Sequence, residues 1–480
     1  MQFLTTTPLA FLLFFMILAL GPVRGLWPFF LTMPLGASAA MNLSGLGSLS
    51  LTDFCVVALW MSILWRPVGF SHIIWTLKPG EPGFALLMMI LFGTISAIFL
   101  PRVLSGSTEV YILAKRGEGI ASVLIPLQPV GANISQIARL IIAASSFVLL
   151  ATVFRKFGGT NYVVRAMILA SSLHIFLSLL DVASHTLGFP QLLSFIRTSS
   201  AMMLDNQMML GIKRMTGGFP EPSSFSYYTI GLYAFWLRYW FQPQSSRLAG
   251  FMLVAMGLLL IRSTSTAAYV CMGVFTILFF TFHVAKIARD RKAAIVYLVA
   301  GFVAPAVLGA FTVAYSFIPE LQSLLDQILF SKASSHSGVQ RMMWNEQALV
   351  NFYETYGLGT GIGSVRGSSW LTSTLGSMGI IGFGLYMWFI GSALTMRPPL
   401  EHRQSQTSHI AAALQCGAAA VFVQSLITKP YPNLEVPFFA MAGVAVGLLG
   451  YQARARVTAR KVQPSGSETE RYPETRASPL

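Results

Sequence analysis

The stretch FALLMMILFGTISAIFL, residues 84–100, contains no charged side chain and only two hydroxyl groups. A membrane-crossing helix needs about 20 mostly apolar residues, and this stretch comes close to that length. The pattern recurs along the chain: 54% of the 480 residues are hydrophobic, only 10% are charged, and the mean hydropathy is +0.65. Soluble proteins carry about 25% charged residues. The sequence therefore predicts an all-α fold, a polytopic integral membrane helical bundle.

Eleven apolar segments from Leu51 onward are candidate spans, and the first 40 residues add one or two. We therefore expect about 12–13 transmembrane helices. Met1–Thr7 contains no Lys or Arg, which argues against a cleavable signal peptide. The three cysteines lie inside apolar segments with no metal or disulfide spacing, so burial explains them. The expected spans lie near 51–65, 84–100, 137–154, 163–187, 225–241, 248–262, 266–285, 293–317, 372–396, 409–427 and 434–450.

Basic residues gather in particular loops of the chain, which carries a net charge of +15. One cluster lies within 286–292 and another within 454–461, after the last span. The positive-inside rule places such loops in the cytoplasm, so the C-terminus is expected there. Residues 1–450 then form the transmembrane domain, and residues 451–480 form a basic tail too polar to build a core. The segments 101–136, 188–224, 318–371 and 428–433 are expected outside the cytoplasm.

The largest external segment, 318–371, is expected to contain an amphipathic helix. A capping-box pattern, Ser-x-x-Gln, begins at Ser337, and apolar residues recur at helical spacing over 338–355. Arg341 falls near the start of this helix, where the helix dipole favours an anion. Trp344 lies beside Arg341 on the helix surface. The helix thus holds a cation on a firm element outside the membrane.

The stretch GLGTGIGSVRGSS, residues 357–369, holds five glycines within eleven residues and one arginine, Arg366. Glycines such as Gly361 and Gly363 leave two alternatives open: tight packing of the loop against helices, or backbone amides gathered around an anion. Arg366 and Lys332 favour phosphate contact, since external cations run against the positive-inside preference and a guanidinium binds phosphate through two bonds. The stretch lacks the ending and the preceding strand of a nucleotide-binding loop.

Three further external corners are polar and stiff. GGFPEPSSFSYY, residues 217–228, holds Glu221 between two prolines. This carboxylate either caps the following helix or acts as a general base at the membrane surface. IRSTSTAAY, residues 261–269, places Arg262 and several hydroxyl groups at the junction of two spans, and residues 126–140 open another span with amide side chains.

Taken in order, these features resemble the bacterial O-antigen ligase and polymerase superfamily, and its exopolysaccharide polymerase branch most. The resemblance covers residues 120 to 390, roughly, and no single piece carries it. The pieces are Asn133 with Gln136, the stretch 218–223, the junction 263–266, Arg341 with Trp344, the glycine stretch, and GSMGIIGFGLY at 376–386.

The resemblance implies a metal-independent glycosyltransferase of the bacterial inner membrane that uses no cofactor. Its donor would be an undecaprenyl-diphosphate-linked oligosaccharide on the periplasmic face, and its product a longer polysaccharide. Arg341 would bind the diphosphate and Glu221 would be the general base. Besides the lipid bilayer, a chain-length regulator and export machinery are candidate partners, and nucleic acid is not. The remaining expected substrate-binding residues are Arg366, Arg262, Lys332, Trp344, Gly361 and Gly363.

Two alternatives stay open. An O-antigen ligase would transfer the glycan to lipid A core, but its branch shows a His after the glycine run, and residues 364–375 contain none. The missing His leaves His336 and Glu346 as weaker candidates for the base. A polysaccharide or lipid transporter would use ionisable groups in paired, broken spans. The polar residues within or near the spans form no repeat, which favours hydrogen bonds between helices instead: Asp53, His174, Asp181, Gln415 and Gln424.

Overall fold

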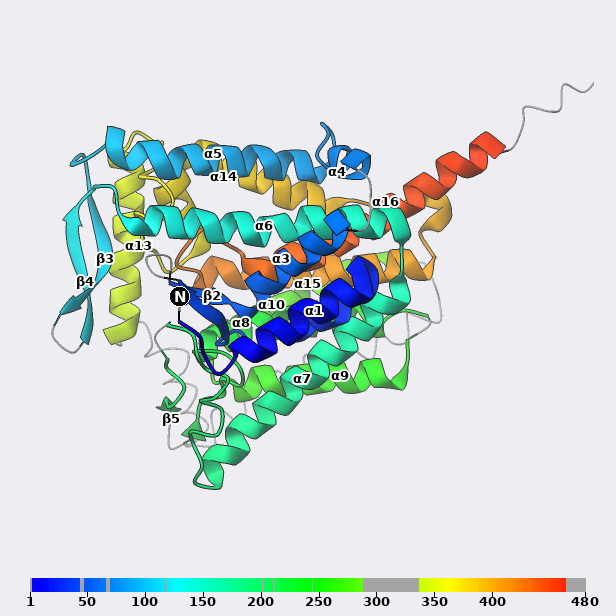
Figure 1. Cartoon of the computed structure of the whole chain (residues 1–480), viewed down its shortest axis with the longest axis horizontal. Coiled ribbons are helices and arrows are strands. Elements are labelled where there is room, and N and C mark those ends of the chain that lie inside the picture. Colours follow the sequence, from blue (N-terminus) through cyan, green and yellow to red (C-terminus); the bar gives the residue numbers. More distant parts are fainter. Residues whose placement is uncertain are drawn as a thin grey trace, which may run out of the picture.

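The computed structural model describes residues 2–43, 47–65, 70–116, 119–200, 203–209, 212–243, 245–287 and 336–462. Within them the chain is a bundle of helices that run side by side along the long axis of the molecule (Figure 1). Seven helices are long and apolar enough to cross a membrane, and two shorter ones are also apolar. This confirms the predicted all-α polytopic membrane fold. The expected span at 293–317, Lys332 and the tail after 462 lie outside the described residues.

The helices begin and end close to the expected spans, and most breaks between them fall at Gly or Pro. The N-terminal part contains α1 Thr7–Arg24, α2 Leu26–Thr32, α3 Leu51–Trp65, α4 Phe70–Thr76, α5 Pro82–Val103, α6 Gly131–Phe157 and α7 Thr160–Thr186. After these come α8 Pro222–Trp240, α9 Arg247–Arg262, α10 Thr266–Ile287, α13 His336–Glu354, α14 Trp370–Thr395, the short 3₁₀ turn Leu400–His402, α15 Gln406–Thr428 and α16 Glu435–Val462.

Helix α16 forms the centre of the bundle. In the most apolar 18-residue window of Glu435–Ala455, 83% of the residues are buried, a larger share than in the corresponding window of any other spanning helix of the described chain. Small residues let α6 approach: a Cβ on Gly443 would lie 2.7 Å from the Phe147 carbonyl oxygen, and one on Gly447 would lie 2.8 Å from that of Ala151. Helices in a bilayer pack by such close approach, because lipid removes the hydrophobic drive between them.

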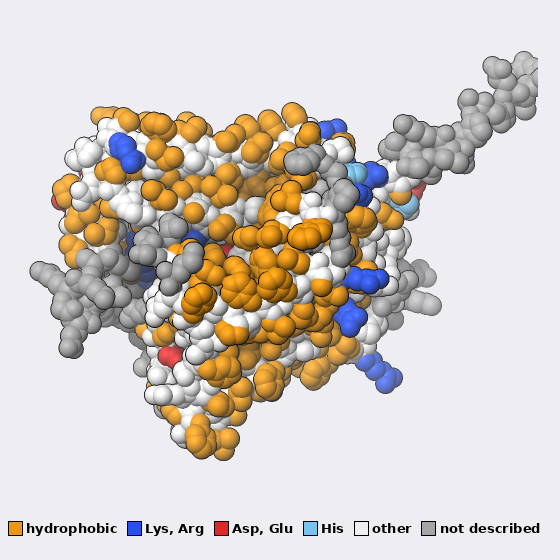
Figure 2. Space-filling model, in the orientation of Figure 1, with side chains coloured by type: hydrophobic (Ala, Val, Ile, Leu, Met, Phe, Trp, Pro, Cys, Tyr) orange, Lys and Arg blue, Asp and Glu red, His pale blue; other side chains and the backbone are white. Residues whose placement is uncertain are grey.

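The two ends of the bundle differ. Figure 2 shows apolar side chains over the flank, and several Lys and Arg at the right-hand edge, where α16 leaves the bundle; we call this the basic end. The opposite end carries three antiparallel hairpins among the described residues, and α13 lies across it beside β3 and β4 (Figure 1). We call it the hairpin end. Its strands are β1 Ala39–Leu43, β2 Gly47–Ser50, β3 Glu109–Arg116, β4 Gly119–Pro126, β5 Met208–Met209 and β6 Ile212–Lys213.

Polar residues inside the spans join helices to one another, as the sequence predicts. The ring nitrogen Nε2 of His174 on α7 lies 2.8 Å from the Thr229 hydroxyl on α8. The amide of Gln424 on α15 lies 2.7 Å from the hydroxyl of Ser226 on α8. Gln415 donates to the Ala393 and Met396 carbonyls at the end of α14. These bonds satisfy polar groups that would be costly in hydrocarbon.

The glycine stretch packs into a break in α14. At Gly379 the backbone leaves helical geometry, with φ 63° and ψ −166°. The Thr360 and Gly361 amides donate to the carbonyls of Gly376 and Ser377 at 2.9 and 2.8 Å, and the Ile380 amide donates to the Gly357 carbonyl at 2.9 Å. The loop thereby satisfies backbone groups that the broken helix leaves without partners.

Of the two alternatives for these glycines, the geometry favours tight packing. Residues 359–365 are buried, and Gly361 and Gly363 have positive φ of 92° and 89°. A Cβ at Gly361 would lie 2.6 Å from the Ser96 carbonyl oxygen on α5, and one at Gly363 would lie 2.4 Å from that of Ala132 on α6. The Gly361 amide is bonded within the protein, so it is not offered to a ligand.

We predict that Gly361→Ala lowers the free energy of unfolding by about 2 kcal/mol or more, because it adds both a steric clash and a disfavoured backbone conformation. Thermal unfolding of the purified protein in detergent measures this. Gly384→Ala on α14 is the control, since a Cβ there meets nothing within 4 Å. Equal midpoints for the two variants would contradict the packing described here.

Candidate functional site

A pocket of about 350 Å³ opens among α3, α6, α8 and α16 at the hairpin end. Its wall combines charged, hydroxyl and aromatic side chains, which is unusual for an apolar bundle. Three of the charged residues begin or precede helices, so they lie where the spans end rather than in their middle. Its polar and aromatic lining includes Ser50, Thr52, Asp53, Gln136, Arg139, Phe219, Glu221, Ser223, Ser224, Tyr227, Thr428, Lys429, Tyr431, Asn433 and Glu435.

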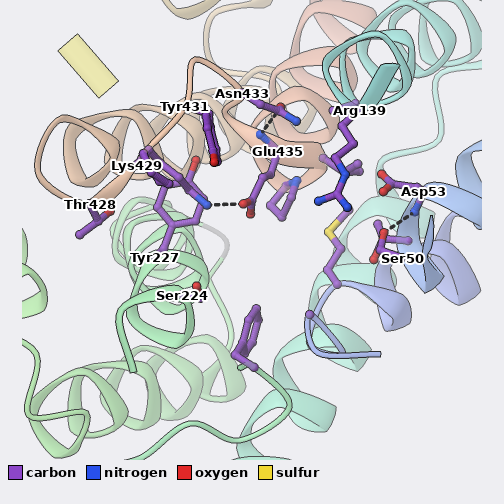
Figure 3. Close-up of a pocket in the computed structure, with 18 of the residues that line it drawn as sticks. Ser50, Asp53, Arg139, Ser224, Tyr227, Thr428, Lys429, Tyr431, Asn433 and Glu435 are labelled. Carbon is purple, nitrogen blue, oxygen red and sulfur yellow. Dashed lines mark hydrogen bonds and ion pairs between the residues drawn. The ribbon is translucent and has the colours of Figure 1, made fainter. Parts of the chain in front are cut away.

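Lys429 forms the centre of one side of the pocket. Its ammonium pairs with the Glu435 carboxylate and lies 3.9 Å from the centre of the Tyr227 ring. The Lys429 side chain is 9% exposed and that of Glu435 is 52% exposed. A buried ammonium needs such a partner, and an aromatic face adds a further attraction. The pair thus holds a cation at a fixed place in the wall (Figure 3).

Glu435 is held in an unusual backbone conformation, with φ 62°. Its amide donates to the Asn433 side-chain oxygen at 2.8 Å. Non-glycine residues rarely adopt this region, and strain of this kind concentrates at functional sites. The conformation directs the carboxylate toward Lys429 rather than along α16 (Figure 3).

Arg139 and Asp53 form the other side. Figure 3 shows the guanidinium and the carboxylate facing each other across the pocket from Lys429, with Glu435 between the two sides. Arg139 also donates to the Ser48 carbonyl at 3.3 Å, which ties α6 to β2. The Asp53 amide donates a hydrogen bond to the Ser50 hydroxyl oxygen at 3.0 Å at the start of α3. Each cation of the pocket therefore faces a carboxylate.

Glu221 lines the same pocket and precedes α8. Its Oε1 accepts hydrogen bonds from the hydroxyls of Ser223 and Ser224, the second at 3.2 Å. It occupies the N-cap position of α8, but its side chain accepts no bond from the backbone there. The capping alternative is therefore not the one that the geometry favours. The two serines fix Oε1 of the carboxylate, and Glu221 lies in the lining of the pocket.

We call Arg214, Arg262 and Arg341 the arginine cluster, because the charges of Arg341 and Glu221 both act on Arg214, and those of Arg214 and Arg262 both act on Tyr269. Burial lowers the pKa of Arg214, the nearby charge of Arg341 lowers it further, and Glu221 acts in the opposite direction. Arg214 donates to the Thr264 carbonyl at 3.2 Å, and Arg262 donates to the Lys213 carbonyl at 2.8 Å. Arg341 takes part in none of the ion pairs among the described residues.

Arg366 belongs to a separate aromatic stack. Its guanidinium lies 4.6 Å from the Trp344 ring centre, and it donates to the Tyr431 hydroxyl at 3.4 Å. Trp344 in turn donates to Ser122 on β4 at 2.8 Å. Tyr431 lines the pocket, so Arg366 contacts the pocket wall through Tyr431. This stack links α13, the glycine stretch and the segment before α16.

The segment ahead of α8 is fixed by a buried charge network around Asp181 on α7. Asp181 pairs with Arg197 at 2.6 Å and with Lys213, and its second oxygen accepts the amides of Thr216 and Gly217 at 3.0 and 3.1 Å. All three charged side chains are at most 4% exposed. The network lies next in sequence to Arg214 and shortly before Glu221, so it positions both.

The structure thus brings together several of the predicted site residues. Glu221 lines the pocket. Arg341 and Arg262 belong to the arginine cluster with Arg214. Trp344 packs on Arg366. Gly361 and Gly363 instead pack against α5 and α6, and Lys332 lies outside the described residues. Sequence reasoning missed the roles of Lys429, Tyr431 and Glu435.

The missed residues come from the short segment between α15 and α16. The sequence TKPYPNLE places Lys429 on the side expected to be external, against the positive-inside preference, and two prolines stiffen the turn. The same argument that singled out Arg341 would have found Lys429. Among the described residues no cluster of His, Cys, Asp and Glu is suited to a metal ion. No model of a known protein family matches the chain, and no curated protein matches it.

We predict that Asp181→Asn lowers the free energy of unfolding by about 3–5 kcal/mol, because it removes the carboxylate that pairs with buried Lys213 and one of the two that pair with buried Arg197. Denaturant titration in detergent measures this. Asp205→Asn is the matched control: Asp205 is 23% exposed and pairs with Arg197 alone at 2.8 Å. Its loss should cost about 1 kcal/mol or less. A cost for Asp181→Asn no larger than that of the control would contradict the role given to the network.

Proposed function

We propose that the protein is a polysaccharide polymerase that joins lipid-diphosphate-linked oligosaccharide units at the extracytoplasmic face of a bacterial inner membrane. The observation that carries the proposal is the placement of Glu221. This carboxylate lines a polar pocket at one end of an apolar bundle and also acts on an arginine cluster beside it. A base between a hydroxyl-rich pocket and a cationic cluster is what transfer of a sugar from a diphosphate requires.

In the proposed step, an acceptor sugar hydroxyl attacks the anomeric carbon of the donor. Its oxygen forms the new glycosidic bond, and its proton passes to the carboxylate of Glu221. The bond between the anomeric carbon and the diphosphate oxygen breaks, and its electron pair leaves with the diphosphate. The charge that develops on the leaving group is stabilised by the arginine cluster, where Arg341 stands without a carboxylate partner among the described ion pairs.

The surroundings support a lipid-borne substrate. The apolar flank of the bundle reaches the hairpin end (Figure 2), so a carrier tail can remain in the bilayer while its diphosphate meets the cations. The hairpins, α13 and the pocket all lie at this end (Figure 1). Charged residues at the basic end include Arg155, Lys156, Arg397, Arg403 and Arg454, which favours a cytoplasmic location for that end.

We predict that Ser107→Cys, on the exposed turn after α5, reacts with a membrane-impermeant maleimide in intact cells with permeabilised outer membranes. Gln404→Cys, exposed before α15, should react only after the inner membrane is opened. The natural cysteines give little background, because Cys55 and Cys271 are buried and Cys416 lies inside a spanning helix. The opposite pattern would place the pocket in the cytoplasm and refute the proposal.

We predict that Glu221→Gln lowers polymer formation by about 10²- to 10⁴-fold through loss of the base. Arg341→Ala should lower it by about 10²- to 10³-fold, as loss of one charge-stabilising group does elsewhere. Each variant is expressed in a deletion strain at the wild-type protein level, and the polymer and the lipid-linked sugars are quantified. Single repeat units should accumulate on the lipid carrier.

The matched controls are Glu354→Gln and Arg102→Ala, two exposed residues at the same end of the molecule, which should leave the polymer unchanged. Normal long-chain polymer from both site variants would overturn the assignment. Glycan missing from lipid A core, with normal polymer still on the carrier, would identify the ligase alternative. Substrate retained on the cytoplasmic face would identify a transporter.

A further inference from the structure

The net charge of the pocket lining indicates which part of the substrate binds there. Two cationic and three carboxylate side chains line it, which gives the lining a net charge of −1. Lys429 is paired with Glu435, and Arg139 faces Asp53 (Figure 3). The remaining carboxylate, Glu221, accepts hydrogen bonds from serine hydroxyls. Both cations are therefore balanced within the wall, and the surplus charge is negative.

A phosphate group is poorly suited to such a wall. In the lipid-linked donor it is an anion, and it offers acceptors rather than donors. In the pocket it would face three carboxylates and would compete with them for Lys429 and Arg139. The arginine cluster presents the opposite environment, with three guanidinium groups and none of them in the lining of the pocket. Glu221 is the carboxylate that both regions share.

An uncharged sugar ring fits the same wall well. Its hydroxyls can donate to the carboxylates and accept from Lys429 and Arg139, while its apolar C–H faces suit aromatic rings. The lining includes the rings of Phe219, Tyr227 and Tyr431, of which Phe219 and Tyr227 are buried and Tyr431 is partly exposed. Its volume of about 350 Å³ lies at the lower end of the range of small-molecule sites, which is about 300–1,000 Å³.

We infer that this pocket is the acceptor subsite and binds the terminal sugar of the growing glycan as a neutral polyhydroxyl ring. The Lys429–Glu435 pair on one side and Arg139 with Asp53 on the other position its hydroxyls, and Tyr431 packs on its face. The diphosphate of the donor binds on the other side of Glu221, at the arginine cluster. The inference rests on the proposed function and adds the division of the site into a sugar side and a phosphate side.

The test uses the full-length protein in lipid nanodiscs and matched probes that differ only in charge. Saturation-transfer NMR measures binding of glucose, galactose, mannose and N-acetylglucosamine, and of glucuronate and galacturonate as charged counterparts. Titration calorimetry measures binding of inorganic diphosphate. At least one neutral sugar should bind about fivefold or more tightly than its uronate, as expected for one unfavourable charge contact that is screened as fully as in bulk water.

Substitutions at Tyr431 and Arg341 then show at which of the two sites each probe binds. Tyr431→Ala should weaken the neutral sugar about tenfold or more by loss of ring stacking and leave diphosphate binding unchanged. Arg341→Ala should do the reverse, and Tyr431→Phe should retain most sugar binding. Should Tyr431→Ala fail to fold, as judged by thermal unfolding, the preference of the wild-type protein between the sugar and its uronate decides the matter.

Three results would overturn the inference: binding of none of the neutral sugars, a uronate that binds as tightly as its neutral partner, or diphosphate binding that depends on Tyr431 instead of Arg341. These outcomes are separate from a failure of the proposed function. If pocket variants make normal polymer while Glu221→Gln and Arg341→Ala do not, the polymerase proposal stands and the sugar subsite is wrong. If those two also make normal polymer, the proposed function itself fails.

Discussion

The Asp181 carboxylate is the interaction on which the site depends. A charge buried at the end of a spanning helix is costly unless it is paired and fully hydrogen-bonded. Asp181 meets that condition with two cations and two backbone amides, all drawn from the segment between α7 and α8. That segment has almost no regular structure of its own, so the ion network, rather than a sheet or helix, holds its backbone in place. The ion network thereby fixes the positions of Arg214 and Glu221.

A second constraint is the separation of polar from apolar surfaces. The flank must face hydrocarbon, so charged groups can gather only at the ends, and the two ends use them differently. At the basic end most of them lie at helix ends and along short connections, although Arg155 is buried there and pairs with Glu81. At the hairpin end the charged groups around the pocket are paired or stacked on rings, as Arg366 is on Trp344 and Lys429 is on Tyr227. Rigidly held charges of both signs can orient a substrate, whereas solvated ones cannot.

Much of the architecture could be predicted from the sequence. The length of an apolar segment shows whether it can span the membrane, and the polar residues, glycines and prolines that interrupt it show where the span ends. The amphipathic helix expected at 338–355 is α13, His336–Glu354, and the polar residues inside spans bond between helices as expected. The site was predicted only in part. Arg341, Arg262 and Glu221 stood out as external charges, but their grouping depends on Arg214, whose neighbours come from three distant segments.

The pocket itself could not be predicted, for a physical reason. Its residues are contributed by α3, α6, α8 and the turn before α16, and no local pattern records that these ends meet. For the glycine stretch, the sequence pattern was visible but allowed two different structures. Composition alone suits either an anion cradle or close packing, and only the neighbouring carbonyls of Ser96 and Ala132 distinguish them.

The break in α14 bears on how the chain is assembled. Since the carbonyls of Gly376 and Ser377 accept hydrogen bonds from the amides of Thr360 and Gly361 rather than from within the helix, the first half of this helix is incomplete on its own. Exposed to hydrocarbon alone, it would carry bare backbone dipoles. Stable insertion of Trp370–Gly379 in a bilayer therefore depends on docking of the turn that precedes it in the chain.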